Sequence, residues 1–399
     1  MRADPIVVCF PFIGDEVGGS HISAIRLIEA LNPSQVRPIV VLHVADGPVA
    51  AYVKQRGIPF VEAPLRARPG ANGRGLRAIG PALGALAPLT RFLRQHGVAI
   101  VHTNDGRCHA IWALPARLAG ARQLWHHRGD PDARGANWLA PLLAGHIVTV
   151  SHFSRPERPV RGVGHKLSVV HSPFDPPTDA GDRAGARARL IAELGCPSDT
   201  AFLGYFGLLI DRKRPLGFVE AVAAFVDRHP EIPVMGLLFG VPGREAPRLG
   251  EAVLGRASAL GIEGRIRLMG YRQPVEPWMQ AMDILLVPAV REPFGRTLIE
   301  AMFLGTPVVA TRDGGNPEAI EHDVNGILVP LEQPEAFVEP IFRLLTDPDH
   351  RRRIVETARA RAHATYNVET HVARLTAIYQ ALCRRAPETS PGAVRRTIP

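Results

Sequence analysis

The sequence lacks several features that mark common classes of protein. It holds no run of roughly 18 uncharged apolar residues, so we expect no membrane span. It has four cysteines, far apart and without a Cys-x-x-Cys pair, which favours reduced, mostly buried thiols in a reducing compartment. None of the lysines follows a glycine, which excludes the Gly-Lys-Ser/Thr loop of nucleotide triphosphatases.

Aromatic residues make up only 6% of the chain, too few to supply base-stacking surfaces, and we expect no nucleic-acid partner. The N-terminus leads directly into the apolar run Ile6–Phe10, which is too short for a signal-peptide core and is interpreted as a first strand. No Gly-x-Gly-x-x-Gly follows that strand, which argues against a dinucleotide-dependent oxidoreductase. We therefore predict a cytoplasmic protein.

Acidic residues are scarce in one half. Residues 1–175 hold 20 Lys+Arg against 11 Asp+Glu, whereas residues 176–399 hold 27 of each, so the net charge of +9 belongs to the first part. No acid occurs between Ala63 and Asn104, a stretch that carries six arginines. This pattern suggests an anionic partner, and we predict peripheral contact of the Arg66–Arg94 region with acidic lipid. An arginine-rich composition on a solvated face is the alternative.

Short apolar runs alternate with longer helical segments along the chain, which is typical of parallel α/β architecture. A chain of 399 residues exceeds one ordinary core. We expect two Rossmann-like domains facing across a cleft, residues 1–175 and 176–367, joined near 173–185. A helix over 368–385 is expected to pack back on the first domain, before a disordered tail from 386. Leu76–Gln95 is expected to bend or split at its prolines.

The stretch from Val287 to Ala301 is the most informative. A strand ends at Val287, a tight loop follows, and a helix begins near Arg296 or Thr297. Free amides at a helix N-terminus, together with the helix dipole, form a site for a diphosphate that needs no cation. A carboxylate beside a diphosphate is repulsive unless it faces hydroxyl donors, which favours sugar contacts for Glu292 and Glu300.

Glu292, followed by Pro-Phe-Gly, and Glu300, followed by Ala, resemble the signature of family 4 retaining glycosyltransferases of the GT-B fold. Further matching motifs surround them: Met269–Arg272, Ala281–Asp283, Gly305–Ala310, Gly314–Glu318 and Asn325–Pro330. The resemblance is clear from about residue 200 to 366. It implies a metal-independent transferase with no cofactor, which moves a sugar from a nucleotide-diphosphate donor to a glycan or lipid-linked acceptor, as in polysaccharide pathways.

The resemblance also implies roles for the matched residues. Glu292 would bind hydroxyls of the donor sugar, and Glu300 would bind the ribose. The loop Gly270, Tyr271 and Arg272 would border the base. The sugar and diphosphate would be held by the backbone amides of Phe294, Gly295, Arg296, Thr297 and Leu298.

Lys213 forms a second candidate site. A cation at a helix start is disfavoured by the dipole, so its position suits an anionic ligand. In the family, an Arg at the strand end and a Lys shortly afterwards neutralise the leaving diphosphate. Lys213 matches that Lys, but Leu208 occupies the Arg position, so one charge is lost where negative charge develops. Arg212 or Arg214 could replace it; a solvated basic turn is the alternative.

The N-terminal half is harder to interpret. Gly18 and Gly19 resemble the Gly-Gly loop that faces the donor phosphates in the family, although an ordinary strand-to-helix turn fits nearly as well. A family His that meets the donor sugar aligns with Arg128, beside His127. His102 is a further crevice candidate of low specificity, and we expect no metal site. A nucleotide-sugar epimerase and a non-catalytic nucleotide-sugar-binding subunit remain alternatives.

Overall fold

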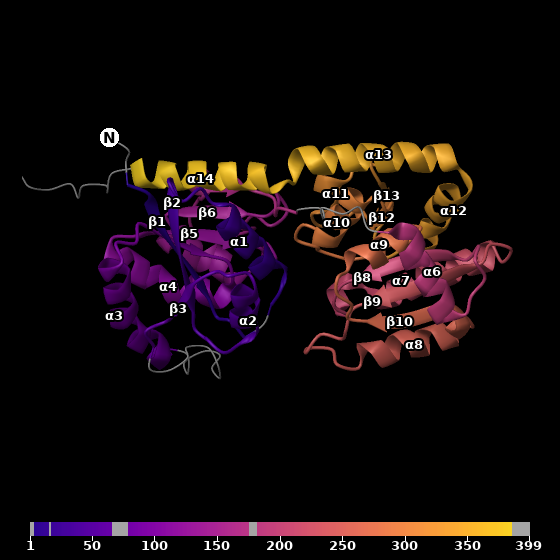
Figure 1. Cartoon of the computed structure of the whole chain (residues 1–399), viewed down its shortest axis with the longest axis horizontal. Helices are drawn as coiled ribbons and strands as arrows, with labels where there is room; N and C mark the ends of the chain where they lie inside the picture. The colour runs from indigo at the N-terminus through magenta and orange to yellow at the C-terminus, as the bar shows by residue number, and fades with distance from the viewer. Residues whose placement is uncertain (1–3, 16, 66–78, 175–181, 385–399) are drawn as a thin grey trace, which may run out of the picture.

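The computed structural model describes residues 4–15, 17–65, 79–174 and 182–384, and shows two parallel sheets side by side (Figure 1). The first sheet has the strand order β3-β2-β1-β4-β5-β6-β7. Its strands are β1 (Ile6–Phe12), β2 (Val36–Leu42), β3 (Phe60–Glu62), β4 (Ile100–Thr103), β5 (Arg122–His127), β6 (His146–Thr149) and β7 (Leu167–Val169). Its helices are α1 (Gly19–Ala30), α2 (Pro48–Gln55), α3 (Ile79–Gln95), α4 (Gly106–Ala119) and α5 (Ala140–Leu143), the last preceded by a helical turn, Gly135–Leu139.

The second sheet has the order β10-β9-β8-β11-β12-β13. Its strands are β8 (Ala201–Phe206), β9 (Val234–Phe239), β10 (Ile266–Gly270), β11 (Ile284–Val287), β12 (Val308–Thr311) and β13 (Ile327–Val329). Its helices are α6 (Arg183–Leu194), α7 (Pro215–Arg228), α8 (Leu249–Ala259), α9 (Glu276–Ala281), α10 (Arg296–Leu304), α11 (Asn316–Ala319), α12 (Val338–Thr346) and α13 (Pro348–Thr365). The central strands β8 and β11 are buried along their whole length, as expected for a parallel sheet covered by helices on both faces.

Each sheet has one point where the strand order reverses direction, between β1 and β4 in the first and between β8 and β11 in the second. At such a point the loops leaving the two strands diverge to opposite faces of the sheet and open a crevice at the strand C-terminal ends. The candidate residues around Lys213 follow β8, and those around Glu292 follow β11. The fold therefore places both groups at one switch point.

The last helix, α14 (Val368–Arg384), leaves α13 above the C-terminal domain and crosses to the N-terminal one (Figure 1). Leu375, Tyr379 and Leu382 join the same hydrophobic core as Phe10 and Phe12 of β1. The Tyr379 hydroxyl lies 2.6 Å from Nδ1 of His102, which pairs the buried phenol with a buried imidazole. Helix α14 is thus part of the hydrophobic core of the N-terminal domain, although it follows the C-terminal domain in the sequence.

The segment expected to bend or split is, over its described part, the single helix α3, which continues through Pro88 and is therefore not split there. Pro81 lies in the first turn of α3, where its missing N–H has no intrahelical partner to lose. The expected linker, 173–185, overlaps α6, because the Asp182 carboxylate accepts a hydrogen bond from the Gly185 amide and starts the helix early. The expected tail from 386, and residues 66–78 of the basic stretch, lie outside the described residues.

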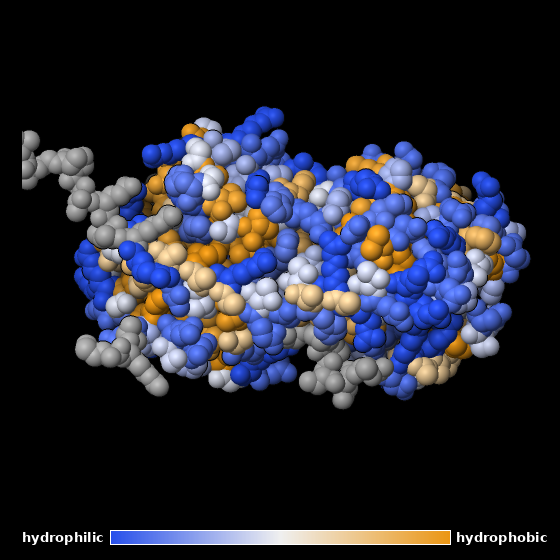
Figure 2. Space-filling model, turned by 90° about the horizontal axis from the view of Figure 1, so that it is seen from above, coloured by the Kyte–Doolittle hydropathy of each residue, from blue (hydrophilic) through white to orange (hydrophobic). Residues whose placement is uncertain are grey.

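Within the described residues, no helix combines the length and the apolarity that crossing a membrane requires. Figure 2 looks on to the side that carries α13 and α14, and shows hydrophobic residues gathered more densely over the N-terminal half. The acid-poor half of the sequence is thus also the half with more apolar surface on this side.

The return of α14 to the first core can be tested by mutation. Leu375→Ala removes a fully buried side chain, and we expect it to lower the free energy of unfolding by about 2–5 kcal/mol, measured by urea denaturation. Arg374→Ala, on the exposed face of the same helix, is the control and should change the free energy by less than about 0.5 kcal/mol. Equal effects of the two substitutions would contradict the packing of α14.

Candidate functional site

The amino end of α10 faces the crevice of the second sheet. Gly295 caps this helix with φ of 71°, in the left-handed region that glycine adopts without strain. The amides of Leu298 and Ile299 bond back to the Gly295 carbonyl, whereas the first amides of a helix have no intrahelical acceptor. The helix therefore presents free N–H groups and its positive dipole end to the crevice, the arrangement that binds phosphate groups.

The loop before α10 is held by the Gly314–Gly315 turn that follows β12. The Gly315 amide donates to the Glu292 carbonyl at 2.7 Å, and the Asp313 carboxylate accepts from the Arg291 amide. A Cβ on Gly314 would lie 2.5 Å from the Glu292 carbonyl oxygen, and Gly314 has φ of +59°. The two turns are in backbone contact at this point, which only glycine permits.

Glu292 is 9% exposed and lies between two cations. Its Oε2 accepts a hydrogen bond from Nη1 of Arg212 at 2.8 Å and lies 4.0 Å from Nζ of Lys213. The Val290 amide also donates to the Arg212 carbonyl at 2.8 Å. The negative charge of Glu292 helps burial to raise the pKa of the Tyr205 hydroxyl, with burial the larger cause. The loops after β8 and β11 thus meet through a buried, charge-compensated cluster.

The structure distinguishes the two arginines that could replace the one missing at Leu208. Arg212 points to Glu292, whereas Arg214 points away and pairs with Glu332 at 2.6 Å on the exposed surface. Leu208 itself is 50% exposed. Of the two, only Arg212 brings a guanidinium to the group that contains Lys213.

Lys213 lies over Gly207, the residue that follows β8. A Cβ on Gly207 would fall 2.9 Å from Nζ of Lys213, and Gly207 has φ of +134°, a region that other residues rarely adopt. The lysine therefore occupies the space that a side chain at Gly207 would fill, and its ammonium group is held at the strand end.

Glu300, one turn into α10, is paired with Arg296, whose Nε lies 2.8 Å from Oε1. Burial raises the pKa of the Glu300 carboxyl, and the neighbouring Arg296 opposes that rise. The same guanidinium donates from Nη1 to Oγ of Ser23 in α1, at 3.0 Å. Its Cδ lies 3.4 Å from where a Cβ on Gly19 would be. Arg296 thus spans the two domains and covers the carboxylate expected to bind the ribose.

Gly18 and Gly19 stand at the start of α1, with Gly18 as the capping residue. The Gly18 amide donates to Nδ1 of His21 at 3.1 Å, so the turn is closed locally. Gly19 faces the side chain of Arg296, which the sequence did not indicate. The amino end of α1 is thereby brought opposite the amino end of α10.

Arg128 is partly buried, and its side chain is held by polar groups of the N-terminal domain. It donates to Oδ1 of Asn104 at 3.3 and 3.2 Å and to Oγ of Ser172 at 2.9 Å. Burial, assisted by the charge of Arg296, lowers the pKa of Arg128 to about 9. His127, its neighbour, is occupied with the carbonyl of Asp130 at 2.9 Å.

His102 and His126 form a buried pair, Nε2 to Nδ1 at 3.1 Å, below Arg128. Burial, and next the positive charge of Arg128, lower the pKa of both imidazoles well below the usual range. They are therefore neutral near pH 7, and His102 serves as a core histidine that holds Tyr379. Among the described residues there is no group of three or more His, Cys, Asp or Glu side chains able to hold a metal ion.

The loop after β10 lies at the edge of the second sheet. Gly270 has φ of +66°, and Tyr271 is 72% exposed. Arg272 pairs with Glu193 of α6, through Nη1 and Oε2 at 3.0 Å, and its guanidinium lies 4.6 Å from the ring of Trp278. The Tyr271 ring is thus exposed to a ligand, whereas the Arg272 side chain is engaged in packing.

Residues that the sequence reasoning did not assign fasten the donor-side loop to the N-terminal domain. Both oxygens of Glu318 accept backbone amides across the gap, from His152 and Phe153, each at 2.7 Å. The ring of His171 stacks on Phe294 with centroids 4.7 Å apart. Glu318 belongs to a motif quoted above, but its partners lie 165 and 166 residues away, so no local pattern could reveal them.

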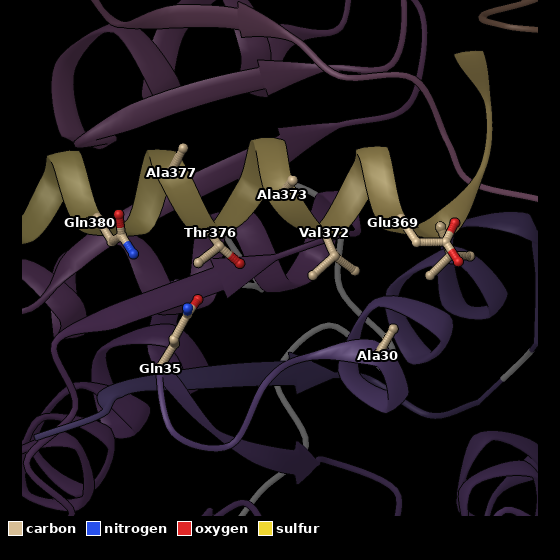
Figure 3. A pocket seen from close by; sticks show the side chains of 9 residues that line it. Ala30, Gln35, Glu369, Val372, Ala373, Thr376, Ala377 and Gln380 are labelled. Atoms are coloured by element: carbon tan, nitrogen blue, oxygen red, sulfur yellow. The ribbon is translucent and has the colours of Figure 1, made fainter. Parts of the chain in front are cut away.

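A separate groove of about 570 Å³ lies between α14 and the Ala30–Gln35 turn (Figure 3). Val372 and Thr376 line one side, and Gln35 lines the other. Gln35 directly precedes β2, so the groove is at the amino ends of the strands, the edge opposite the crevice. It is not part of the candidate site.

Comparisons with known proteins agree with this geometry. Residues 200–347 match the family model described as glycosyl transferases group 1. The chain is 34% identical over 219 residues to a D-inositol 3-phosphate glycosyltransferase of Corynebacterium urealyticum, over 54% of this chain and 50% of the relative. It is 36% identical over 211 residues to the protein of the same name from Corynebacterium jeikeium, over 51% and 49%. The chain thus spans about half the length of the curated relatives it matches.

Two solved structures are similar over nearly the whole chain. Anabaena Alr3699/HepE in complex with UDP and glucose has a TM-score of 0.77 at 22% identity, with 94% of this chain and 100% of that chain covered. A glycosyltransferase from Rickettsia africae ESF-5 has a TM-score of 0.79 at 18% identity, with 96% and 100% covered. The fold is therefore GT-B, and the match of residues 200–347 to the glycosyl transferases group 1 model confirms the resemblance found in the sequence over that part of the chain.

The backbone contact at Gly314 can be tested directly. Gly314→Ala forces a Cβ against the Glu292 backbone, and we expect a loss of about 2–4 kcal/mol in the free energy of unfolding, measured by denaturant titration. Gly261→Ala is a matched control, because Gly261 has φ of +67° with no atom within 4 Å of its Cβ. It should cost only about 1–2 kcal/mol from the left-handed backbone. A loss at Gly314 no larger than at Gly261 would show that the two turns do not constrain each other.

Proposed function

We propose that this chain is a retaining, metal-independent glycosyltransferase. It would move a sugar from a nucleotide-diphosphate donor, a UDP- or GDP-sugar, to a glycan, lipid-linked or small-molecule acceptor. The observation that carries the proposal is the meeting of Arg212 and Lys213 with Glu292 beside the amino end of α10. Cations, free amides and a helix dipole converge where a diphosphate would lie.

The donor pose follows from the charges. A diphosphate placed against the first amides of α10 would attract Arg212 and Lys213, and Glu292 would then turn its oxygens to sugar hydroxyls, which are donors. The ribose would lie by Glu300 and compete with Arg296 for its carboxylate. The UDP bound in the Anabaena structure supports UDP as the first nucleotide to test.

The transfer step would rest on charge stabilisation and alignment. The bond between the anomeric carbon and the phosphate oxygen breaks, a bond from the acceptor oxygen to the same face of that carbon forms, and the acceptor proton passes to the leaving phosphate. Arg212, Lys213 and the α10 amides would stabilise the charge that develops on that phosphate. No protein nucleophile is assigned.

The basic N-terminal half supports an anionic acceptor on that side, since residues 1–175 carry an excess of nine positive charges. The name of the Corynebacterium relatives, D-inositol 3-phosphate glycosyltransferase, supports a phosphorylated small molecule as one candidate. The rival functions give different products from the same mixture. Transfer gives a glycosylated acceptor, an epimerase converts donor alone to an epimer, and a binding subunit turns over neither.

Replacing Arg212 tests the proposed charge compensation. Arg212→Ala should weaken binding of the nucleoside diphosphate by about 1.5–3 kcal/mol, the order of a lost hydrogen bond to a charged group, measured by calorimetry. Arg214→Ala, two residues away but paired with Glu332 on the surface, is the matched control and should change it by less than about 0.5 kcal/mol. An Arg212 variant that binds like the wild type would contradict its role as the replacement for the missing arginine.

Glu300→Ala should weaken nucleotide affinity by about 1–3 kcal/mol, because a charged acceptor for the ribose hydroxyls is lost. Because the same change removes the carboxylate partner of Arg296, nucleotide affinity is also measured for Arg296→Ala and for the double variant. The four proteins form a thermodynamic cycle. If the ribose contact is real, the double variant still binds more weakly than Arg296→Ala alone. Equal affinities of these two variants would contradict a ribose role for Glu300.

A further inference from the structure

A second surface of the N-terminal domain has no role in the proposed chemistry. The turn Gly135–Leu139 and helix α5 bury Ala136 and Ala140 but leave Trp138 63% exposed and Leu142 54% exposed. Large apolar side chains of this kind rarely gather on a surface without a partner. We call Trp138, Leu139, Leu142 and Val160, with the arginines beside them, the Trp138 surface.

Hydrogen bonds fix a second segment against this turn. The Val160 amide donates to the Asn137 carbonyl at 2.9 Å, and the Arg158 amide donates to Oδ1 of Asn137 at 2.7 Å. The backbone of Val160, a residue that is 45% exposed, is thereby held beside Asn137, the residue that precedes Trp138. Asn137 also donates to the carbonyls of Pro131 and Ala133, so the platform beneath the exposed side chains is rigid.

The charge around the Trp138 surface is mostly positive, and the two acids that precede it, Asp130 and Asp132, face Arg291. Residues 133–172 contain five Lys and Arg and a single acid, Glu157. Arg134, Arg158 and Arg161 are exposed, and Arg158 keeps 89% of its side chain in solvent although Glu157 lies 3.8 Å away. The fifth cation, Lys166, is occupied with carbonyls at the end of α5, so the positive charge that this segment offers to a partner comes from its arginines.

We propose that the Trp138 surface binds the headgroup region of a membrane that carries anionic phospholipid. An indole beside leucines, bordered by cations, is the composition of interfacial membrane contacts: the apolar groups enter the acyl boundary while the cations remain among phosphate groups. A purely polar ligand would leave the exposed apolar side chains of Leu142 and Val160 without an apolar partner. This surface differs from the Arg66–Arg94 stretch expected from the sequence, and it does not depend on the proposed transferase activity.

Co-sedimentation of the full chain with vesicles tests the proposal. Vesicles of phosphatidylcholine containing phosphatidylglycerol should bind the protein, and vesicles of phosphatidylcholine alone should bind it at least about tenfold more weakly, since the cations see no net charge there. Raising the salt concentration should also weaken the binding. Absence of binding, or equal binding to both vesicles, would overturn the proposal.

Variants separate the two contributions. Trp138→Ala with Leu142→Ala, and separately Arg158→Glu with Arg161→Glu, should each lower vesicle affinity by about tenfold or more. Leu254→Ala and Arg353→Glu alter an exposed leucine and an exposed arginine of the C-terminal domain and should leave the affinity unchanged. Unfolding curves confirm that each variant is folded. If the controls weaken binding equally, or if sedimentation equilibrium shows a dimer that Trp138→Ala dissociates, the surface does not serve a membrane.

Discussion

Compensation of a buried carboxylate governs the architecture of the crevice. Glu292 is withdrawn from water, and an unpaired charge in that position would cost several kcal/mol. Arg212 and Lys213 supply the compensation, and to do so the loop after β8 must reach the loop after β11. Gly207 makes room for the lysine, and Gly314 makes room for the Glu292 backbone. The two glycines and the three charges thus serve one requirement.

The same loop is also where the two domains meet. Glu318 caps the amides of His152 and Phe153, His171 stacks on Phe294, and Arg296 reaches Ser23. These contacts tie the amino end of α10 to the N-terminal domain, so a ligand held there would lie at a defined distance from that domain. Helix α14 extends this coupling, since it returns from the C-terminal domain to the first core.

Much of the fold could be predicted because its signals are local. The alternation of short apolar runs with longer helical segments predicts the parallel sheets, and the Glu292–Glu300 stretch carries the GT-B resemblance. The expected linker, 173–185, extends into α6 because the Asp182 cap starts that helix at Arg183. The described part of α3 is one helix, and one of its prolines falls in the first turn. The roles of the site residues stay predictions. The structure adds which side chains pair with one another: Arg212 rather than Arg214 faces Glu292, and Arg296 covers Glu300. Such pairings depend on where each side chain points in the folded chain. The two partners of Arg296, for example, lie 4 and 273 residues away in the sequence.

The proposed chemistry requires a diphosphate held at the amino end of α10. A crystal structure of the full chain grown with UDP, or with GDP if only that nucleotide raises the melting temperature, measures its position directly. We predict diphosphate oxygens within hydrogen-bond distance of the Arg296 and Thr297 amides, with Arg212 and Lys213 turned towards them. A nucleotide bound elsewhere, with Arg212 still on Glu292 and the α10 amides unoccupied, would contradict the central claim.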